Sequence, residues 1–394
     1  MSLRTTSTLP FPRSHRLLFA AASICTFSLG CGKQETTIAP PPKPKPPARV
    51  SDADLQKFKP NETGAVMVLM YHRIEADEPD NDLNRKPASF RNDLKLLRNG
   101  GYHPVTALEL VTNSMDVPIG KTPVAITFDD ALPSQFKIIT GRDGKPHIDP
   151  DCAAGILETF HTQYPEWPTK ATFFVLPKAG RNGEPFGQAG MSGQKFDYLT
   201  KKGYEIANHT ATHDDLRAAS GDKVQAELAA AVRDIKQISP SAAMQTLALP
   251  YGRLPRSESA QKYLVSGSQG GTTYANKAVF LAAWRPILSP VTRNDKKLSE
   301  GGTFSVFNPY RLERIKADAR EAKLPGTFEY WLKYFGKNPG ARYISDGMKE
   351  VVTVPASSQS AVDVVRLKIQ GKRLQVYGGD GKSGGVAGGD LSVE

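Results

Sequence analysis

Between residues 65 and 249 the sequence alternates short apolar segments with amphipathic ones, and this alternation restricts the fold more than any other feature. The apolar segments have the length of buried strands, and the segments between them repeat apolar residues at helical spacing. Strands that alternate with helices favour a parallel sheet, open or closed into a barrel, with functional residues at the carboxyl ends of the strands. The predicted strands are 65–72, 102–105, 123–128, 171–175, 204–207 and 246–249, and the predicted helices are 89–99, 106–113, 153–164, 193–202 and 222–238.

The predicted strand at 123–128 is followed directly by two adjacent carboxylates, Asp129 and Asp130. Successive side chains of a strand point to opposite faces, so both carboxylates can serve one site only if the strand ends there and the backbone turns. In a cleft of low dielectric the two would repel each other unless a cation or a shared proton lay between them. A solvated loop pair is the ordinary alternative, so partners elsewhere in the chain decide between the two.

Two histidines, His209 and His213, follow the predicted strand at 204–207 and therefore belong at the same end of the fold as the aspartates. Their spacing is a weak signal by itself, because seven histidines in 394 residues produce such a pair by chance fairly often. Two neutral imidazoles and one carboxylate, with positions left open, form the ligand set of a catalytic zinc-like site. The sequence therefore points to a divalent metal, with zinc as the first candidate.

The sequences TFDD at 127–130 and HTATH at 209–213 together resemble those of the polysaccharide deacetylases of carbohydrate esterase family 4, which have the NodB-like fold. Residues 171–175, 203–208 and 249–252 support the resemblance, which covers roughly residues 66–251. It implies an α/β fold of the distorted (β/α) barrel type with fewer than eight strands. It also implies the following roles: Asp130, His209 and His213 hold the metal, Asp129 is the general base, the backbone N–H of Tyr251 binds the oxyanion, and Trp284 is a further candidate for substrate contact.

The sequence departs from the commonest family pattern at two places. No histidine follows His213, whereas the acid histidine of the family usually lies near the C-terminal end of the domain. Residues 68–74 instead resemble the opening strand of the poly-N-acetylglucosamine deacetylase branch, so His72 is the candidate general acid; a core histidine bonded to a carbonyl is the alternative. Residues 247–250 also lack the arginine that often orients the base. Arg285 could replace it, although a structural ion pair is the simpler role for Arg285.

The ends of the chain have compositions unlike the domain between them. Three arginines followed by an apolar stretch predict a removable export signal at 1–30, and Cys31 resembles a lipidated lipoprotein cysteine; an ordinary secretory signal is the alternative. Only Cys152 then remains, so no intrachain disulfide framework is expected. We predict four further segments: a Pro/Lys-rich tether at 31–50, a catalytic domain at 51–340, a small C-terminal β appendage at 341–377 and a disordered Gly-rich tail at 378–394. Within them we expect a helix at 311–323 and, in the appendage, strands at 350–354, 362–367 and 373–377.

The formal charge of +11 is spread along the chain and accompanies no nucleic-acid-binding motif, which favours work near an anionic surface over nucleic-acid binding. We expect a metal-dependent hydrolase, monomeric, that removes N-acetyl groups from an N-acetylglucosamine-containing polysaccharide outside the cell or in the cell wall. It would be exported to the cell envelope, where lipid on Cys31 would be its sole membrane attachment, or secreted. Two alternatives remain open: an O-acetyl esterase acting on a glycan, and a non-catalytic glycan-binding lipoprotein.

Overall fold

The structure is a computed structural model that describes residues 48–178, 183–294, 302–317 and 325–379. The predicted export signal, Cys31, most of the tether and nearly all of the Gly-rich tail lie outside these residues. Among the described helices, none combines the length and the apolar composition that crossing a membrane requires.

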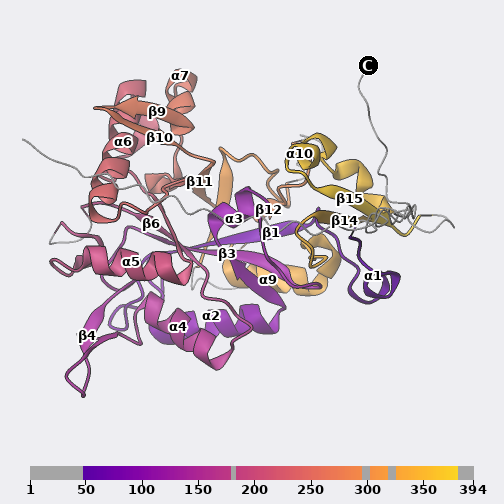
Figure 1. Cartoon of the computed structure of the whole chain (residues 1–394), viewed down its shortest axis with the longest axis horizontal. Coiled ribbons are helices and arrows are strands. Elements are labelled where there is room, and N and C mark those ends of the chain that lie inside the picture. The colour runs from indigo at the N-terminus through magenta and orange to yellow at the C-terminus, as the bar shows by residue number, and fades with distance from the viewer. Residues whose placement is uncertain (1–47, 179–182, 295–301, 318–324, 380–394) are drawn as a thin grey trace, which may run out of the picture. The chain divides into compact units, whose positions relative to one another are not determined.

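Seven parallel strands close into a barrel, because each strand pairs with the next and the last pairs with the first (Figure 1). The short strand β2 (Tyr102–Val105) extends the sheet beside β3, and β12 (Ile287–Leu288) pairs antiparallel with β1. The predicted distorted (β/α) barrel with fewer than eight strands is confirmed. Around the barrel the strands are β1 (Ala65–Tyr71), β3 (Thr122–Asp129), β6 (Thr172–Val175), β7 (Glu205–Asn208), β8 (Thr246–Ala248), β11 (Ala278–Ala283) and β13 (Leu312–Lys316).

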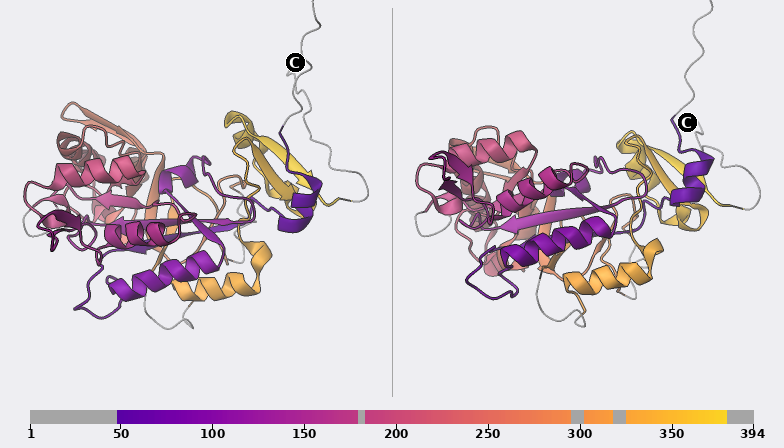
Figure 2. Two further views of the ribbon diagram at one scale, coloured as in Figure 1. Left: turned by 60° about the horizontal axis from the view of Figure 1, so that its bottom comes forward. Right: turned by 90° about the horizontal axis from the view of Figure 1, so that it is seen from below.

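Amphipathic helices cover the outside of the barrel (Figures 1 and 2). Their apolar residues pack on the strands, which explains the helical spacing in the sequence. Thr106 and Glu109 form a capping box at the start of α3. The helices are α1 (Asp52–Phe58), α2 (Pro87–Asn99), α3 (Ala107–Val111), α4 (Ala153–Gln163), α5 (Ser192–Lys202), α6 (Gly221–Ile238), α7 (Glu258–Gln261), α9 (Phe328–Lys337) and α10 (Val364–Ile369).

Strands β1 and β3 are buried along their whole length, which is why they appear in the sequence as continuous apolar runs. Alternate side chains enter different parts of the core. Val66, Val68 and Ala125 belong to one cluster, whereas Met67 and Leu69 pack in a second cluster with residues of α2, α4, α5 and α6. The apolar residues therefore fix both faces of each strand.

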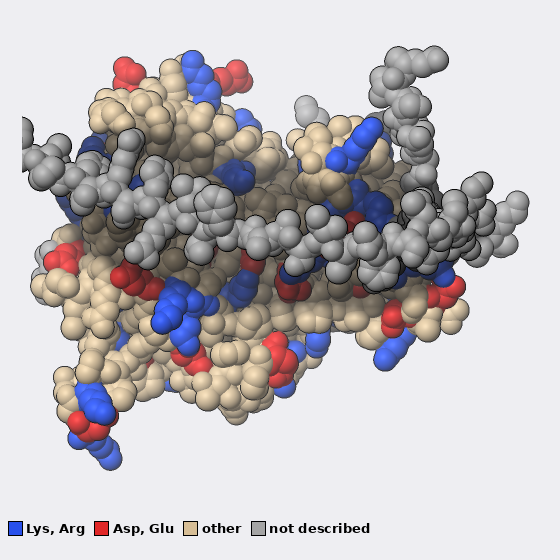
Figure 3. Space-filling model, viewed as in Figure 1, with Lys and Arg blue, Asp and Glu red and all other residues tan. Residues whose placement is uncertain are grey.

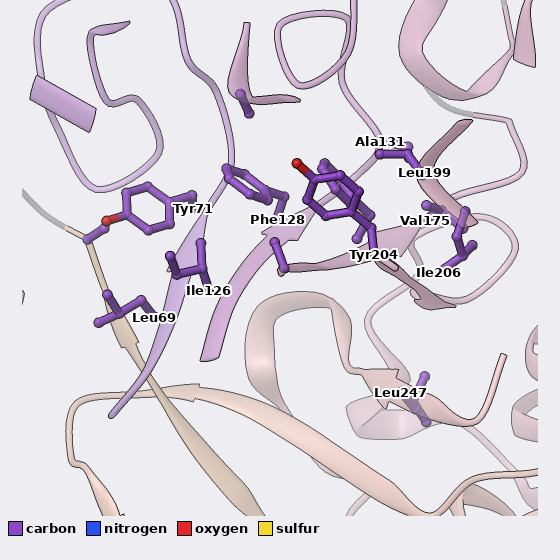
Figure 4. Packing of buried hydrophobic residues seen from close by; sticks show 14 of the residues in the cluster. Leu69, Tyr71, Ile126, Phe128, Ala131, Val175, Leu199, Tyr204, Ile206 and Leu247 are labelled. Carbon is purple, nitrogen blue, oxygen red and sulfur yellow. The ribbon is translucent and has the colours of Figure 1, made fainter. Parts of the chain in front are cut away.

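A row of aromatic rings connects neighbouring strands within the second cluster (Figure 4). The ring centroids of Tyr71 and Phe128 lie 5.6 Å apart, those of Phe128 and Phe173 are stacked at 5.0 Å, and Tyr204 meets Phe173 edge-on at 5.7 Å. Such pairs contribute about 0.5–1.5 kcal/mol each beyond the apolar area that they bury. They hold together the strand ends that carry His72 and Asp129.

Two predictions of secondary structure in the C-terminal third are wrong. The segment predicted as a helix at 311–323 contains strand β13. The charged side chains of this strand do not face solvent as on a helix surface, because Arg314 pairs with Asp129 and Lys316 with Asp82. The segment at 362–367 lies largely in α10, whose N-cap Asp363 accepts a hydrogen bond from the backbone N–H of Arg366. The appendage is therefore β14 (Val351–Pro355), α10 and β15 (Arg373–Tyr377), with its two strands parallel.

Two further pairs of short strands among the described residues lie outside the barrel. Strands β4 (Ile138–Thr140) and β5 (Pro146–Ile148) form one hairpin, and β9 (Ser266–Gln269) pairs with β10 (Thr272–Ala275) beside α6. On the face drawn in Figure 3, lysine and arginine side chains are interspersed with aspartate and glutamate. This distribution agrees with a charge spread along the sequence.

Candidate metal centre and active site

Asp129 and Asp130 reach one site because the backbone turns where strand β3 ends. Asp129 is the last residue of β3, and Asp130 and Ala131 both adopt left-handed conformations, with φ of 80° and 52°. Residues other than glycine seldom take such angles, so the surrounding structure imposes them. The turn expected from the sequence therefore lies at Asp130.

Asp130, His209 and His213 form a cluster in which the candidate ligand atoms all lie within 4.8 Å of one another. Oδ1 of Asp130 is 3.2 Å from Nε2 of His209 and 3.4 Å from Nε2 of His213. Nδ1 of His209 lies 2.8 Å from the carbonyl oxygen of Ala248, an acceptor, so we assign its proton to Nδ1 and leave Nε2 free to act as a ligand.

The three residues fit a divalent cation. Oδ1 of Asp130 is buried and has no hydrogen-bond partner in the structure, although two imidazole nitrogens stand beside it. A buried carboxylate oxygen without a partner is costly, and a cation between it and the imidazoles would remove that cost. One carboxylate and two imidazoles are also a donor set that zinc accepts.

Glu227 of α6 holds the loop that carries the two histidines. Its buried carboxylate accepts hydrogen bonds from the backbone N–H groups of Ala211 and Thr212, at 3.1 and 3.0 Å, and from the Thr212 hydroxyl at 2.9 Å. Lys223 lies 2.7 Å from the same carboxylate. Sequence reasoning missed Glu227; the only signal is an acidic residue on the apolar face of an amphipathic helix.

Arg314 of β13 orients the candidate base Asp129. Its Nη1 and Nη2 donate to Oδ1 and Oδ2 of Asp129 at 2.6 and 2.7 Å, and both side chains are buried. Burial, the largest single effect, would raise the pKa of Asp129, but the Arg314 guanidinium together with His209 and His72 outweighs burial and lowers this pKa. Arg314 therefore supplies the charge that the sequence lacked near residue 248. Arg285, the candidate named for this role, instead pairs with Glu313.

His72 lies directly after β1 and faces Asp129. Its Nε2 is 4.0 Å from Oδ2 of Asp129, and its Nδ1 is buried without a hydrogen-bond partner. Burial lowers the pKa of His72, against the opposing effect of the Asp129 carboxylate. Gln135 connects the two residues, since its side-chain amide donates to the backbone carbonyl of His72 at 2.8 Å and also to that of Asp129. Gln135 is a further residue that sequence reasoning missed.

Tyr251 lies beside the metal cluster. It belongs to a short turn, Pro250–Gly252, with φ of 59°, and its ring centroid is 5.0 Å from that of His213. Gly252 must be glycine, because a Cβ there would lie 2.1 Å from the backbone nitrogen of Ala282. The role of the Tyr251 backbone in oxyanion binding remains a prediction.

Trp284 lies farther from the cluster, directly after β11, and its side chain is 43% exposed. The ammonium nitrogen of Lys316 lies 5.3 Å from the centre of its ring. Two acids after the histidine motif are in ion pairs, Asp214 with Lys223 and Asp215 with Arg253. Two other histidines also have local partners: His147 pairs with Asp143, and His161 lies against the Trp167 carbonyl.

A cavity of about 460 Å³ opens beside the metal cluster. Asp130 and His213 form part of its wall, together with Leu132, Leu176 and Lys178. The cavity gives a ligand direct access to two of the three candidate metal ligands. Its walls combine apolar side chains such as Leu132 and Leu176 with polar ones such as Lys178.

The comparisons with known proteins agree with the motifs. Residues 116–265 match the family model for polysaccharide deacetylase. A chitooligosaccharide deacetylase of Sinorhizobium fredii is 33% identical over 82 residues, which are 21% of this chain and 34% of that protein. The chain thus spans about a third of the length of this relative.

Solved structures of deacetylases are also similar to this chain. BC0361, a polysaccharide deacetylase from Bacillus cereus, has 17% identity and a TM-score of 0.46, with 69% of this chain and 68% of that chain covered. The Streptococcus pyogenes deacetylase PplD has 17% identity and a TM-score of 0.42, with coverages of 63% and 92%. IcaB from Ammonifex degensii has 18% identity and a TM-score of 0.37, with coverages of 55% and 84%.

The segment matched by the family model contains Asp129, Asp130, His209, His213 and Tyr251. These are the residues on which the sequence resemblance depends. The resemblance predicted from the sequence is confirmed over this segment: residues 116–265 match the polysaccharide deacetylase family model.

Proposed function

We propose that this protein is a metal-dependent hydrolase that removes N-acetyl groups from an N-acetylglucosamine-containing polysaccharide outside the cell or in the cell wall. The observation that carries the proposal is the position of Asp129, which Arg314 holds beside the Asp130, His209 and His213 cluster and opposite His72. The acid on the first strand favours the poly-N-acetylglucosamine branch of the family within this proposal.

Asp130, His209 and His213 would hold the metal, with zinc as the first candidate. When bound, such an ion lowers the pKa of water and polarises a carbonyl group. Glu227 keeps the histidine loop in place, and the Ala248 carbonyl fixes the tautomer of His209. Partners of this kind, which orient the ligands, typically change metal affinity by about 10–100-fold when they are removed.

Asp129 acts as the general base. Arg314 donates one hydrogen bond to each carboxylate oxygen of Asp129. Oδ2 also lies 3.9 Å from Nε2 of His209 and 4.0 Å from Nε2 of His72. Because Arg314 lowers the pKa of Asp129, the carboxylate is ionised and can take the proton of the attacking water. The oxygen of that water then bonds to the acetyl carbon.

His72 acts as the general acid when the carbon–nitrogen bond of the amide breaks. The departing amine needs a proton, and Nε2 of His72 faces the same space as the base. Acetate and a free amine on the sugar are the products. The Tyr251 backbone N–H would stabilise the oxyanion that forms before bond cleavage, an effect usually worth about 3 kcal/mol per donor.

Acetate release from N-acetylglucosamine oligomers by the purified protein tests this function. We expect release by the wild type, loss after chelation with recovery on adding zinc, and loss in Asp129→Asn. Undiminished release in Asp129→Asn would overturn the mechanism, and full activity in His72→Ala would reject the acid assignment. An ester substrate cleaved in preference to the amide would indicate an O-acetyl esterase. Oligomer binding by wild type without any acetate release would indicate a glycan-binding protein.

We also propose that the protein is exported to the cell envelope as a monomer and works on its polysaccharide there. The support is the composition of residues 1–50, with a basic start, an apolar stretch and Cys31. Fractionation of cells expressing the full chain and its Cys31→Ala variant tests lipid anchoring. We expect the wild type in the membrane fraction and the variant in the soluble exported fraction; wild type retained in the cytoplasm would reject export.

A further inference from the structure

A second cavity, of about 630 Å³, lies between the ends of β11 and β13 and helix α9. Helix α9 lies on the outside of the barrel next to α2 in both views of Figure 2. We call this cavity the aromatic cleft, and its side-chain walls come chiefly from Trp284, Arg285, Glu313, Tyr330, Trp331 and Tyr334. It shares no lining residue with the cavity beside the metal cluster.

Helix α9, the end of β11 and the glycine at position 326 bring the rings of the aromatic cleft together. Tyr330 and Tyr334 are four residues apart on α9 and therefore lie on the same face of the helix. The indole N–H of Trp331 donates to the backbone carbonyl of Trp284 at 2.6 Å, which attaches the helix to the end of β11. Gly326 closes against Trp284, since a Cβ there would lie 2.7 Å from the Cβ of Trp284.

Polar groups lie among these rings. Arg285 pairs with Glu313 at 3.1 Å, and its side chain is 39% exposed. An ion pair exposed to this degree contributes little to stability, so its hydrogen-bonding groups can exchange water for a ligand at small cost. The pair also leaves no net charge from these two residues, which favours a neutral ligand over an anionic one.

The cleft and the candidate active site lie on opposite sides of one strand. Arg314 points into the barrel toward Asp129, and its neighbour Glu313 points outward to the cleft, because successive strand residues face opposite sides. Trp284 follows the carboxyl end of β11, at the barrel edge that carries the catalytic residues, and Lys316 contacts its ring. The Trp284 end of the cleft and the metal cluster therefore lie at the same edge of the barrel.

We propose that the aromatic cleft binds sugar units of the polysaccharide beyond the unit that is deacetylated. The apolar C–H face of a pyranose packs on aromatic rings, while its hydroxyl and acetamido groups can accept hydrogen bonds from Arg285 and donate hydrogen bonds to the Glu313 carboxylate. This chemistry fits a neutral N-acetylhexosamine chain. The inference rests on the proposed function, because that function supplies a substrate long enough to reach both places.

Substrate length tests the inference. Acetate release is measured with N-acetylglucosamine dimers and hexamers for wild type, Tyr334→Ala and Tyr330→Ala. We expect kcat/KM for the hexamer to fall about tenfold in each variant, in line with the usual strength of a ring contact, and kcat/KM for the dimer to stay within about twofold. Tyr310→Ala, which removes an exposed tyrosine outside the cleft, is the matched control. Tyr334→Phe keeps the ring and should restore most of the hexamer activity.

Direct binding separates failure of the inference from failure of the proposed function. Hexamer affinity is measured by calorimetry in Asp129→Asn, with and without Tyr334→Ala. An affinity about tenfold weaker in the double variant supports the cleft even if the wild type releases no acetate, in which case only the proposed function fails. Equal hexamer affinity in both, or equal loss of activity on dimer and hexamer, overturns the cleft proposal. A change in oligomeric state with unchanged hexamer affinity would assign the cleft to a second copy of the chain and also overturn it.

Discussion

Two arginine–carboxylate pairs that involve neighbouring residues of β13, Glu313 and Arg314, have the same chemistry and different surroundings. Arg314 and Asp129 bond through two nitrogens and two oxygens, with side chains 1% and 3% exposed. Arg285 and Glu313 also pair through two nitrogens, but the exposures are 39% and 15%. Burial decides what each pair can do: the first fixes the carboxylate that we propose as the general base, and the second remains open to water.

The energetics of the two pairs differ for the same reason. A buried pair loses its hydration, and removing one partner leaves an uncompensated charge that costs about 3–5 kcal/mol. An exposed pair keeps its hydration and is worth about 0–1 kcal/mol. We therefore expect Arg314 to matter for both stability and catalysis, and Arg285 to matter mainly for ligand contact.

Arg314→Met should have the largest effect. Asp129 would remain buried and lose its bidentate partner, so the free energy of unfolding should fall by about 3–5 kcal/mol. Its pKa should also rise, because the guanidinium that lowers it is gone. Urea unfolding measures the first effect, and acetate release, which should be lost near neutral pH, measures the second.

The double variant Arg314→Met/Asp129→Asn is the control for this prediction. Removing the carboxylate charge as well should recover part of the stability lost in Arg314→Met, because no buried charge remains unpaired. If the losses of unfolding free energy in Arg314→Met and Asp129→Asn simply add in the double variant, the two residues are not coupled. The contrast with the Arg285–Glu313 pair would then be wrong. Activity should be absent in the double variant in either case.

The same contrast explains which residues could be predicted from the sequence. Asp129 ends β3, Asp130 and His209 directly follow strands, and His213 lies four residues after His209, so local pattern and motif spacing sufficed to place them together. Arg314 is separated from Asp129 by 185 residues, and its strand carries charged side chains that mimic a helical surface. A charged residue whose buried partner is distant in the sequence produces no local pattern of apolar and polar residues, so only the folded chain identifies the pair.

Gln135 and Glu227 were missed for a related reason. Both are buried polar side chains that bond mainly to backbone groups, Gln135 to the carbonyls of His72 and Asp129 and Glu227 to N–H groups of the histidine loop. Backbone partners have no sequence signature. The prediction for the appendage was wrong for a different reason: the apolar residues at 362–367 fit a strand pattern, but the N-cap at Asp363 starts helix α10.

Gln135→Leu should have an intermediate effect, because Gln135 is buried but uncharged. Its amide holds the ends of β1 and β3 together, and its removal leaves two buried carbonyls without that donor, at a cost of about 1–3 kcal/mol. A positioning role predicts a fall in kcat with KM nearly unchanged and with metal content retained. Gln135→Glu, which keeps the size and places carboxylate oxygen against the carbonyls, should be at least as damaging. Full kcat in Gln135→Leu would show that the carbonyl contacts do not set the separation of His72 and Asp129.

Arg285→Met should have the smallest effect on stability, about 0–1 kcal/mol, because the Arg285–Glu313 pair is partly hydrated. Urea unfolding at low and high salt checks this, since what little the pair contributes in wild type should shrink as salt screens it. Activity on the N-acetylglucosamine dimer should be unchanged, since Arg285 makes no hydrogen bond or ion pair to Asp129 in the structure. A loss of stability as large as that of Arg314→Met would show that burial does not separate the two pairs. Loss of dimer activity with normal stability would instead give Arg285 a share in orienting the base, and Arg314 would no longer suffice to explain the position of Asp129.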